Sequence, residues 1–178
     1  NMADSRLIAR GMLPSKNQLA AHIVLRGWFA GRAVLNKRKD KTYVDITPFD
    51  PLRVVFEQDD DGIIWLAYRT LRSSQTIKQL YNVDVPEPTN SEYDDEFGVA
   101  VWDYYDREQH AIVIDGQAPR WGKKPLPHGV TNTEGEGVAP VFVGPVGITP
   151  WIQGVYGDAD KTSDYGESVF SANRNLFE

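Results

Sequence analysis

The feature that most constrains the fold is a repeated pattern of two apolar, aromatic-rich runs joined by a short polar turn. The runs 52–58 and 63–71 flank the sequence DDDG, in which Gly62 supplies the positive φ of a tight turn. The runs 99–106 and 110–116 flank the turn REQ. Each pair is typical of a β-hairpin, so the sequence predicts antiparallel strands.

Helical spacing predicts four helices, at 3–13, 15–27, 75–82 and 167–178. In the helix 15–27, Ser15 is the expected N-cap, Gln18 completes a capping box and Gly27 is the expected stop. Ser73 or Ser74 caps the helix 75–82.

The remaining segments complete the predicted order of elements. Strands at 28–35 and 43–49 form a further hairpin, and 140–147 is a short apolar strand. Residues 116–140 and 147–167 lack periodicity and are predicted loops. Antiparallel hairpins with helices at the N- and C-terminal ends predict an α+β fold rather than a strand–helix–strand series. The length of 178 residues predicts one domain spanning 1–178.

Composition narrows the classes of protein. The absence of cysteine excludes a disulfide framework, a cysteine-ligated zinc site and a thiol nucleophile. No apolar run approaches the ~18 residues of a membrane span. The net charge of −6 argues against a protein whose whole surface grips nucleic acid.

The charge is distributed unevenly. Residues 1–41 carry nine basic and two acidic residues, a net of +7, and the remainder carries −13. Much of the basic excess lies in the run KRKDK at 37–41, which is either a solvated loop tip or a contact for phosphate or a partner. Residues 84–97 hold six acids and no base, which predicts a mobile acidic loop.

The sequence contains no complete motif of catalytic or metal-ligating residues. None of the three histidines, His22, His110 and His128, has a second metal ligand two to four residues away. The segment 158–169 begins like a calcium loop, but it has Ser163 where glycine is required. Phosphate-loop and nucleophile-elbow motifs are missing. We therefore expect no enzyme activity, metal or cofactor, although the many carboxylates leave a glycosidase pair open.

The five tryptophans fall into two groups. Three lie in strand-like runs and are expected in the core or on a sheet face, whereas Trp121 and Trp151 lie in predicted loops and either pack there or contact a partner. The candidate subunit or partner contacts are Lys37, Arg38, Lys39, Lys41, Arg120, Trp121, Lys123, Lys124 and Trp151.

The order of segments carries a resemblance. In the stretch 27–69, a helix runs into a glycine-containing strand, a hairpin leads to a "DP-x-x-V" strand, and a "D-x-G" turn precedes a strand with Trp. This order resembles the portal proteins of tailed bacteriophages. The residues that match are Gly27, Gly31, Asp50, Pro51, Val54, Asp61, Gly62 and Trp65.

A second block is similar to the same family. The strands VWDYYD and AIVID lead to the loop PLPHGV, then to the strand start GVAPVFVGPVG and the helix start DYGESVFSANRNLF. Together the two blocks extend the resemblance over residues 15–178.

The resemblance implies a structural protein, the wing of a portal subunit, cut from a longer chain that would add a stem and a clip. The intact protein would form a ring, usually of twelve subunits, at one capsid vertex of a virion assembled in the bacterial cytoplasm. Its partners would be itself, the major capsid or scaffold protein, the terminase and the head–tail adaptor. Double-stranded DNA would pass through the channel without specific binding.

The sequence also leaves two other functions open. One is a β-rich carbohydrate- or receptor-binding module of a phage tail or neck component that uses the loop tryptophans. The other is an enzyme such as a glycoside hydrolase with two buried carboxylates. If portal subunits associate through the +7 and −13 parts of the chain, their association should weaken steeply with salt.

Overall fold

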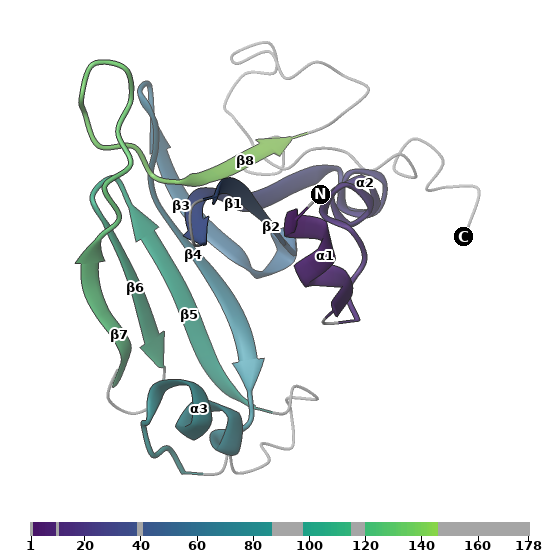
Figure 1. Cartoon of the computed structure of the whole chain (residues 1–178), viewed down its shortest axis with the longest axis vertical. Helices are drawn as coiled ribbons and strands as arrows, with labels where there is room; N and C mark the ends of the chain where they lie inside the picture. Colours follow the sequence, from purple (N-terminus) through teal and green to yellow (C-terminus); the bar gives the residue numbers. More distant parts are fainter. Residues whose placement is uncertain (1, 10, 39–40, 87–97, 115–119, 146–178) are drawn as a thin grey trace, which may run out of the picture. The chain divides into compact units, whose positions relative to one another are not determined.

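The structure, a computed structural model, describes residues 2–9, 11–38, 41–86, 98–114 and 120–145 (Figure 1). Contacts divide the chain into two compact units: the N-terminal unit comprises 1–52 and 141–178, and the sheet unit comprises 53–140. Each contains an antiparallel sheet and at least one described helix, which confirms the predicted α+β class. The prediction of one domain over 1–178 stays a prediction, because contacts alone do not decide whether the two units fold independently.

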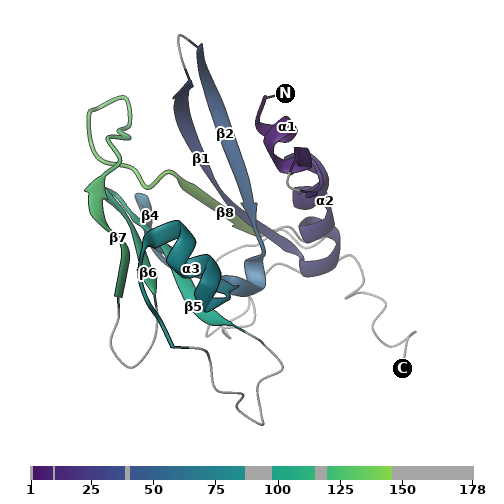
Figure 2. The same cartoon turned by 60° about the horizontal axis from the view of Figure 1, so that its bottom comes forward.

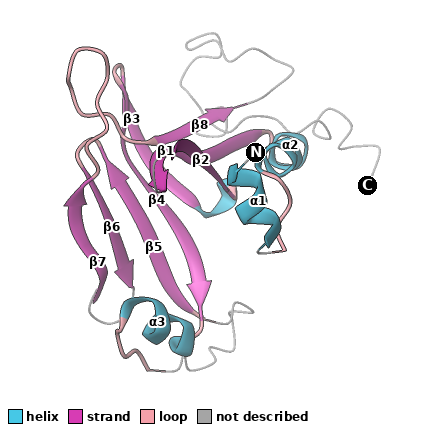
Figure 3. Ribbon diagram, in the orientation of Figure 1, coloured by secondary structure: helices cyan, strands magenta, loops and turns pink. Residues whose placement is uncertain are grey.

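The N-terminal unit has two helices and a three-stranded antiparallel sheet in the order β2-β1-β8 (Figure 3). Both helices pack on this sheet, and the buried side chains of Trp28, Ala30 and Phe49 share one of its faces. The elements are α1 (Met2–Ala9), α2 (Ser15–Arg26), β1 (Trp28–Arg38), β2 (Lys41–Phe49) and β8 (Val141–Pro145).

The junction between α1 and α2 differs from the predicted capping box. Pro14 is the N-cap of α2, and Ser15 is its first helical residue. Ser15 donates from its backbone N–H and its hydroxyl to Asp4 Oδ1, at 3.0 and 2.8 Å. Gln18 Nε2 donates to Leu13 O at 2.6 Å. The predicted cap was therefore wrong, because a carboxylate from the preceding helix satisfies the serine, whereas Gly27 ends the helix at φ 75° as predicted.

Two glycines fix the pairing of β1 with β8. Gly31 lies opposite Phe142, and Gly144 lies opposite Phe29. A Cβ atom on either glycine would lie only 2.6 or 2.5 Å from the ring across from it. Each aromatic ring therefore covers a glycine backbone, a close approach that any side chain at these positions would prevent.

The sheet unit is a five-stranded antiparallel meander in the order β3-β4-β5-β6-β7, preceded by a short 3-10 turn at Pro51–Arg53. One helix, α3, follows β4 and lies across one face of the sheet, over β5 and β6 (Figure 2). The elements are β3 (Val54–Asp59), β4 (Gly62–Arg72), α3 (Ser74–Tyr81), β5 (Val99–Asp106), β6 (Gln109–Ile114) and β7 (Arg120–Pro127).

The core of the sheet unit lies beneath α3. Ile77 of the helix is 0% exposed and packs against Val101, Ile112 and Ile114 of the two central strands. Ser73 is the N-cap of this helix, and its side chain accepts from Thr76 N–H at 3.2 Å. The apolar face of α3 thus closes one side of the sheet.

The predicted acidic loop begins as ordered structure. Val83 and Val85 pack against the core under α3, and Ser74 Oγ donates to Pro86 O at 3.0 Å. Residues 87–97 lie outside the described residues, so the mobility predicted for 84–97 stays a prediction beyond Pro86.

The predicted loop at 116–140 was wrong over β7. This strand pairs with β6 at the edge of the sheet, with register shifts on both sides of Ile112. It contains Pro125 and Pro127, which only an edge strand accommodates because proline cannot donate to a ladder on both sides. The prolines and Gly122 hid the strand from a search for alternating residues. The predicted segments 147–167 and 167–178 lie outside the described residues.

Candidate interaction surfaces

The structure separates the predicted contact residues into two groups. Lys37 and Arg38 end β1 and Lys41 begins β2, so both strands extend further into the basic run than the predicted strands 28–35 and 43–49. The second group belongs to β7, an edge strand of the sheet unit, and not to a loop. Its members are Arg120, Trp121, Lys123 and Lys124. Lys39 and Trp151 lie outside the described residues.

The first group lies at the end of a two-stranded ribbon. β8 pairs with β1 over 28–32, and beyond Arg32 the register within the described residues joins β1 to β2 alone. Figure 2 shows these two strands running on past β8. We call residues 33–38 and 41–46 the hairpin arm.

An exposed apolar pair lies on the hairpin arm. Leu35 and Val44 face each other directly across the two strands, with 72% and 50% of their surfaces exposed. The alternation of strand side chains puts them on the face opposite Ala30 and Phe49, which are buried. Sequence reasoning singled out the neighbouring charges and missed this pair, although the cross-strand register of a hairpin was the signal that could have found it.

The second group borders an aromatic face of the sheet unit, opposite the face that α3 covers. Trp121 is 49% exposed and lies across from Val113, which in turn lies across from Trp102. On the same face, the rings of Trp65 and Tyr104 stack with centroids 6.3 Å apart. We call these side chains, Trp65, Trp102, Tyr104 and Trp121, the aromatic face. Trp65 and Trp102 are therefore half-buried sheet-face residues, as predicted.

Polar partners hold two of these rings. Trp65 Nε1 donates to Glu57 Oε2 at 2.7 Å. The pKa of Tyr104 is raised, first by burial and then by the charge of Asp106 and a hydrogen bond to that carboxylate. The polar atoms of these aromatic residues are thus engaged within the sheet.

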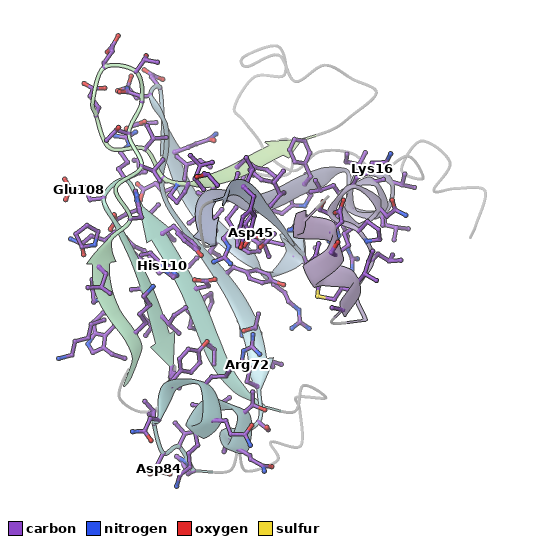
Figure 4. All side chains as sticks on the ribbon, viewed as in Figure 1. Lys16, Asp45, Arg72, Asp84, Glu108 and His110 are labelled. Atoms are coloured by element: carbon purple, nitrogen blue, oxygen red, sulfur yellow. The ribbon has the colours of Figure 1, made fainter. Side chains whose placement is uncertain are left out.

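A histidine cluster lies on the other face of the sheet. His110 of β6 (labelled in Figure 4) has its Nε2 2.5 Å from Asp103 Oδ1, and its ring stacks on Tyr105 with centroids 4.4 Å apart. Lys123 Nζ lies 3.3 Å from the other ring nitrogen, Nδ1. Because an ammonium group can only donate, Nδ1 accepts, so the neutral ring donates from Nε2 to the carboxylate. Tyr105 also donates to Asp103 Oδ2 at 3.2 Å.

This cluster joins three neighbouring strands. Asp103 and Tyr105 come from β5, His110 from β6 and Lys123 from β7, and the Tyr105 ring covers one side of the His110 ring. Within the described part of the chain, moreover, no group of three or more His, Cys, Asp or Glu side chains could hold a metal ion. The calcium-like segment 158–169 lies outside it.

Acidic side chains gather at one end of the five-stranded sheet. Three connections lie at this end: the β3–β4 turn, the β5–β6 turn and the segment 128–140 after β7. The registers of the antiparallel strands bring them to the same end of the sheet. Figure 4 shows Glu108 at this end and Asp84 at the other, beside α3. We call the following residues the acidic end: Asp59, Asp60, Asp61, Asp106, Glu108, Glu134 and Glu136.

Polar contacts fix the shape of the acidic end. Arg107 donates to Asp59 Oδ1, and this hydrogen bond lowers the pKa of Asp59 below its ordinary value. His128 donates from Nε2 to Asp106 O at 2.9 Å and accepts at Nδ1 from Val130 N–H at 3.1 Å. A Cβ on Gly137 would lie 2.4 Å from Arg107 O. The segment 128–140 is therefore held tightly against the β5–β6 turn.

No protein-family model matches the chain, and no curated protein matches it. Among the described helices, none combines the length and the apolar character that crossing a membrane requires.

Proposed function

We propose that this chain is a structural part of a tailed-bacteriophage portal, the wing region of a subunit that forms a ring at one capsid vertex. In this role it presents surfaces to neighbouring subunits and performs no chemistry. The intact ring, usually of twelve subunits, docks the terminase and the head–tail adaptor and meets the major capsid or scaffold protein. The protein is then a virion component assembled in the bacterial cytoplasm.

One observation carries the proposal: the motifs behind the portal resemblance fall on the elements that the resemblance implies, in the same order. The helix α2 ends at Gly27 and runs directly into β1, which contains Gly31. The pair Asp50-Pro51 forms the turn before β3, in which Leu52 N–H donates to Asp50 Oδ1 at 3.2 Å. Gly62 has φ 110° at the β3–β4 turn, and Trp65 follows in β4. This agreement supports a common architecture from α2 to β4.

The charge of the sheet unit is consistent with a DNA conduit. Its acidic end carries seven carboxylates, and Arg107 is the basic residue of the β3–β4 and β5–β6 turns. Affinity for DNA comes largely from basic side chains that neutralise phosphates. An acidic surface repels phosphate instead, which suits a channel wall or rim that DNA passes without specific binding.

The direct test is electron microscopy of the intact gene product that contains this sequence. The proposal predicts closed rings with a central channel. Particles that remain monomers or dimers at every concentration examined would count against it, since a portal subunit must form a closed heterologous assembly.

The aromatic face favours a second candidate, the carbohydrate-binding module. Flat rings such as Trp121 and Trp102 offer stacking surfaces on one sheet face, of which Trp121 is half exposed. This candidate ranks second because the carboxylates of Glu57 and Asp106 already bind Trp65 and Tyr104. Titration of tryptophan fluorescence with oligosaccharides separates the two: a saturable change supports sugar binding, and no change supports the portal.

A further inference from the structure

We propose that His128 is a pH-sensitive latch: its neutral ring fixes the start of the segment 128–140 to the β5–β6 turn, and protonation of the ring releases Val130. The segment follows β7 of the sheet unit and leads along the chain to β8 of the N-terminal unit (Figure 1). The inference goes beyond the proposed portal function and does not depend on it.

Two backbone groups determine which nitrogen of His128 carries the hydrogen. Nε2 lies 2.9 Å from Asp106 O, a carbonyl oxygen that can only accept, so Nε2 donates. Nδ1 lies 3.1 Å from the nitrogen of Val130, whose N–H group can only donate, so Nδ1 accepts. The two partners therefore select the neutral ring in one tautomer, with its hydrogen on Nε2.

A second proton on the ring takes the acceptor away from Val130. In an imidazolium ion both nitrogens are donors, so Nδ1–H and the N–H of Val130 would point at each other. The bond to Asp106 O survives, because Nε2 donates in both states. Since the N–H of Val130 belongs to the main chain, it cannot rotate away as a side chain does. The chain at Val130 must move instead.

Val130 transmits this movement to a short hairpin, residues 130–138. Its carbonyl oxygen accepts from Val138 N–H at 3.1 Å, and Thr131 pairs with Gly137. Gly129 lies between the ring and Val130 at φ 68°, a conformation that glycine adopts without strain, so the chain has freedom to turn at this point. Protonation of one ring therefore loosens the hairpin from the residue that holds its base.

The charges near His128 do not prevent its protonation. Arg107 is engaged by Asp59, and the carboxylate of Asp106 accepts from the N–H groups of Glu108 and Gln109 at 2.8 and 2.6 Å. Carboxylates attract an imidazolium ion, and imidazole is the side chain that ordinarily changes charge between about pH 5 and pH 8. The charged or titratable side chains on the neighbouring strands and turns and on the segment itself are Asp59, Asp60, Asp61, Tyr104, Asp106, Arg107, Glu108, His110, Lys123, Glu134 and Glu136.

Nuclear magnetic resonance of the 178-residue chain tests the latch without any substitution. The nitrogen shifts of the His128 ring at about pH 8 should show the tautomer with hydrogen on Nε2. Amide exchange is then measured at about pH 8 and pH 5 and corrected for the intrinsic rate at each pH. Protection of Val130 and Val138 should fall at least about fivefold at the lower pH, the factor that one hydrogen bond is worth. Protection of Ile114, which is fully buried on β6, should not fall with them.

His128→Asn separates the ring from the other acids and bases. The Oδ1 atom of asparagine is bonded to Cγ, as Nδ1 of histidine is, so it accepts from the N–H group two residues on at either pH. Protection of Val130 should therefore remain and lose its dependence on pH. The matched control is His22→Asn on α2, which removes an imidazole from the N-terminal unit and should leave the pH dependence as it is in the wild type.

Each contrary result overturns the latch. A ring with its hydrogen on Nδ1 at pH 8 would mean that Val130 does not donate to it. Equal protection of Val130 at the two pH values would show that protonation breaks no bond. Both results come from the wild type, so they decide even if the variant does not fold. A pH dependence that survives in His128→Asn would belong to the carboxylates of the acidic end. None of these results bears on the portal function, which fails only if the intact gene product forms no ring.

Discussion

Ile77 tests whether α3 is held by the core of the sheet unit. Its side chain is 0% exposed and packs against Val101 and Ile114, which are 2% and 0% exposed. Ile77→Ala removes three carbon groups, worth roughly 2.4 kcal/mol at ~0.8 kcal/mol each. The cavity left between two rigid strands adds to this cost, so the free energy of unfolding should fall by about 3 kcal/mol.

Leu80 provides the matched control on the same helix. It is 57% exposed, and Leu80→Ala keeps a good helix-forming residue at that position. The free energy of unfolding should therefore fall by less than about 1 kcal/mol. Urea denaturation followed by tryptophan fluorescence measures both variants, with the slope of each transition checked against the wild type.

Two results would refute this packing. A fall of less than about 1 kcal/mol in the free energy of unfolding for Ile77→Ala would mean that α3 does not close the sheet, because truncating a buried isoleucine with fixed neighbours destabilises a protein by more than that. Equal costs for the two variants would mean that the helix has no preferred buried face.

Three further predictions concern the sheet unit. The pKa of Asp59 is lowered from 3.8, so this carboxylate contributes stability above its unfolded pKa and loses that contribution as the pH falls through its folded pKa. Arg107→Ala should therefore lower the free energy of unfolding at neutral pH. In urea titrations below about pH 3.8, the stability of the variant should approach that of the wild type. Gly137→Ala would put a Cβ 2.4 Å from Arg107 O and should cost about 1–3 kcal/mol, measured by thermal unfolding; a neutral result would show that the backbone moves freely there. His110→Phe keeps a ring beside Tyr105 but removes the hydrogen bond between His110 Nε2 and Asp103 Oδ1. The free energy of unfolding should fall by about 1–3 kcal/mol in denaturant titrations, and amide exchange in β6 should become faster; unchanged exchange would contradict the pairing role.

Local patterns predicted the hairpins because the turn chemistry and the strands agree. The run 99–106 matches β5, and the turn DDDG has Gly62 at positive φ. Gly27 ends α2 in the left-handed conformation that a helix stop requires. In each case one short segment contains the whole physical reason for its structure.

Contacts between distant segments set the features that the sequence did not predict. Ser15 binds Asp4 from another helix and so does not act as the N-cap. The strand β7 depends on a neighbour, β6, for its hydrogen bonds, and its prolines conceal the pattern. The pairing of His110 with Asp103 joins two strands whose register cannot be read from the sequence alone.

The candidate surface was predicted in part. The basic run was singled out by its charge, and its described residues Lys37, Arg38 and Lys41 belong to the hairpin arm. The apolar pair beside it, Leu35 and Val44, was not, because exposure depends on which strands cover a face. The acidic end was likewise hidden, since its carboxylates come from three separate connections between strands.

The location of the protein in a virus particle tests the central proposal most directly. Gold-labelled antibody raised against this chain would be applied to opened particles and imaged by electron microscopy. A portal subunit predicts label at a single vertex of each capsid. Label spread over the capsid shell, at the distal tip of the tail or on no particle would contradict the assignment.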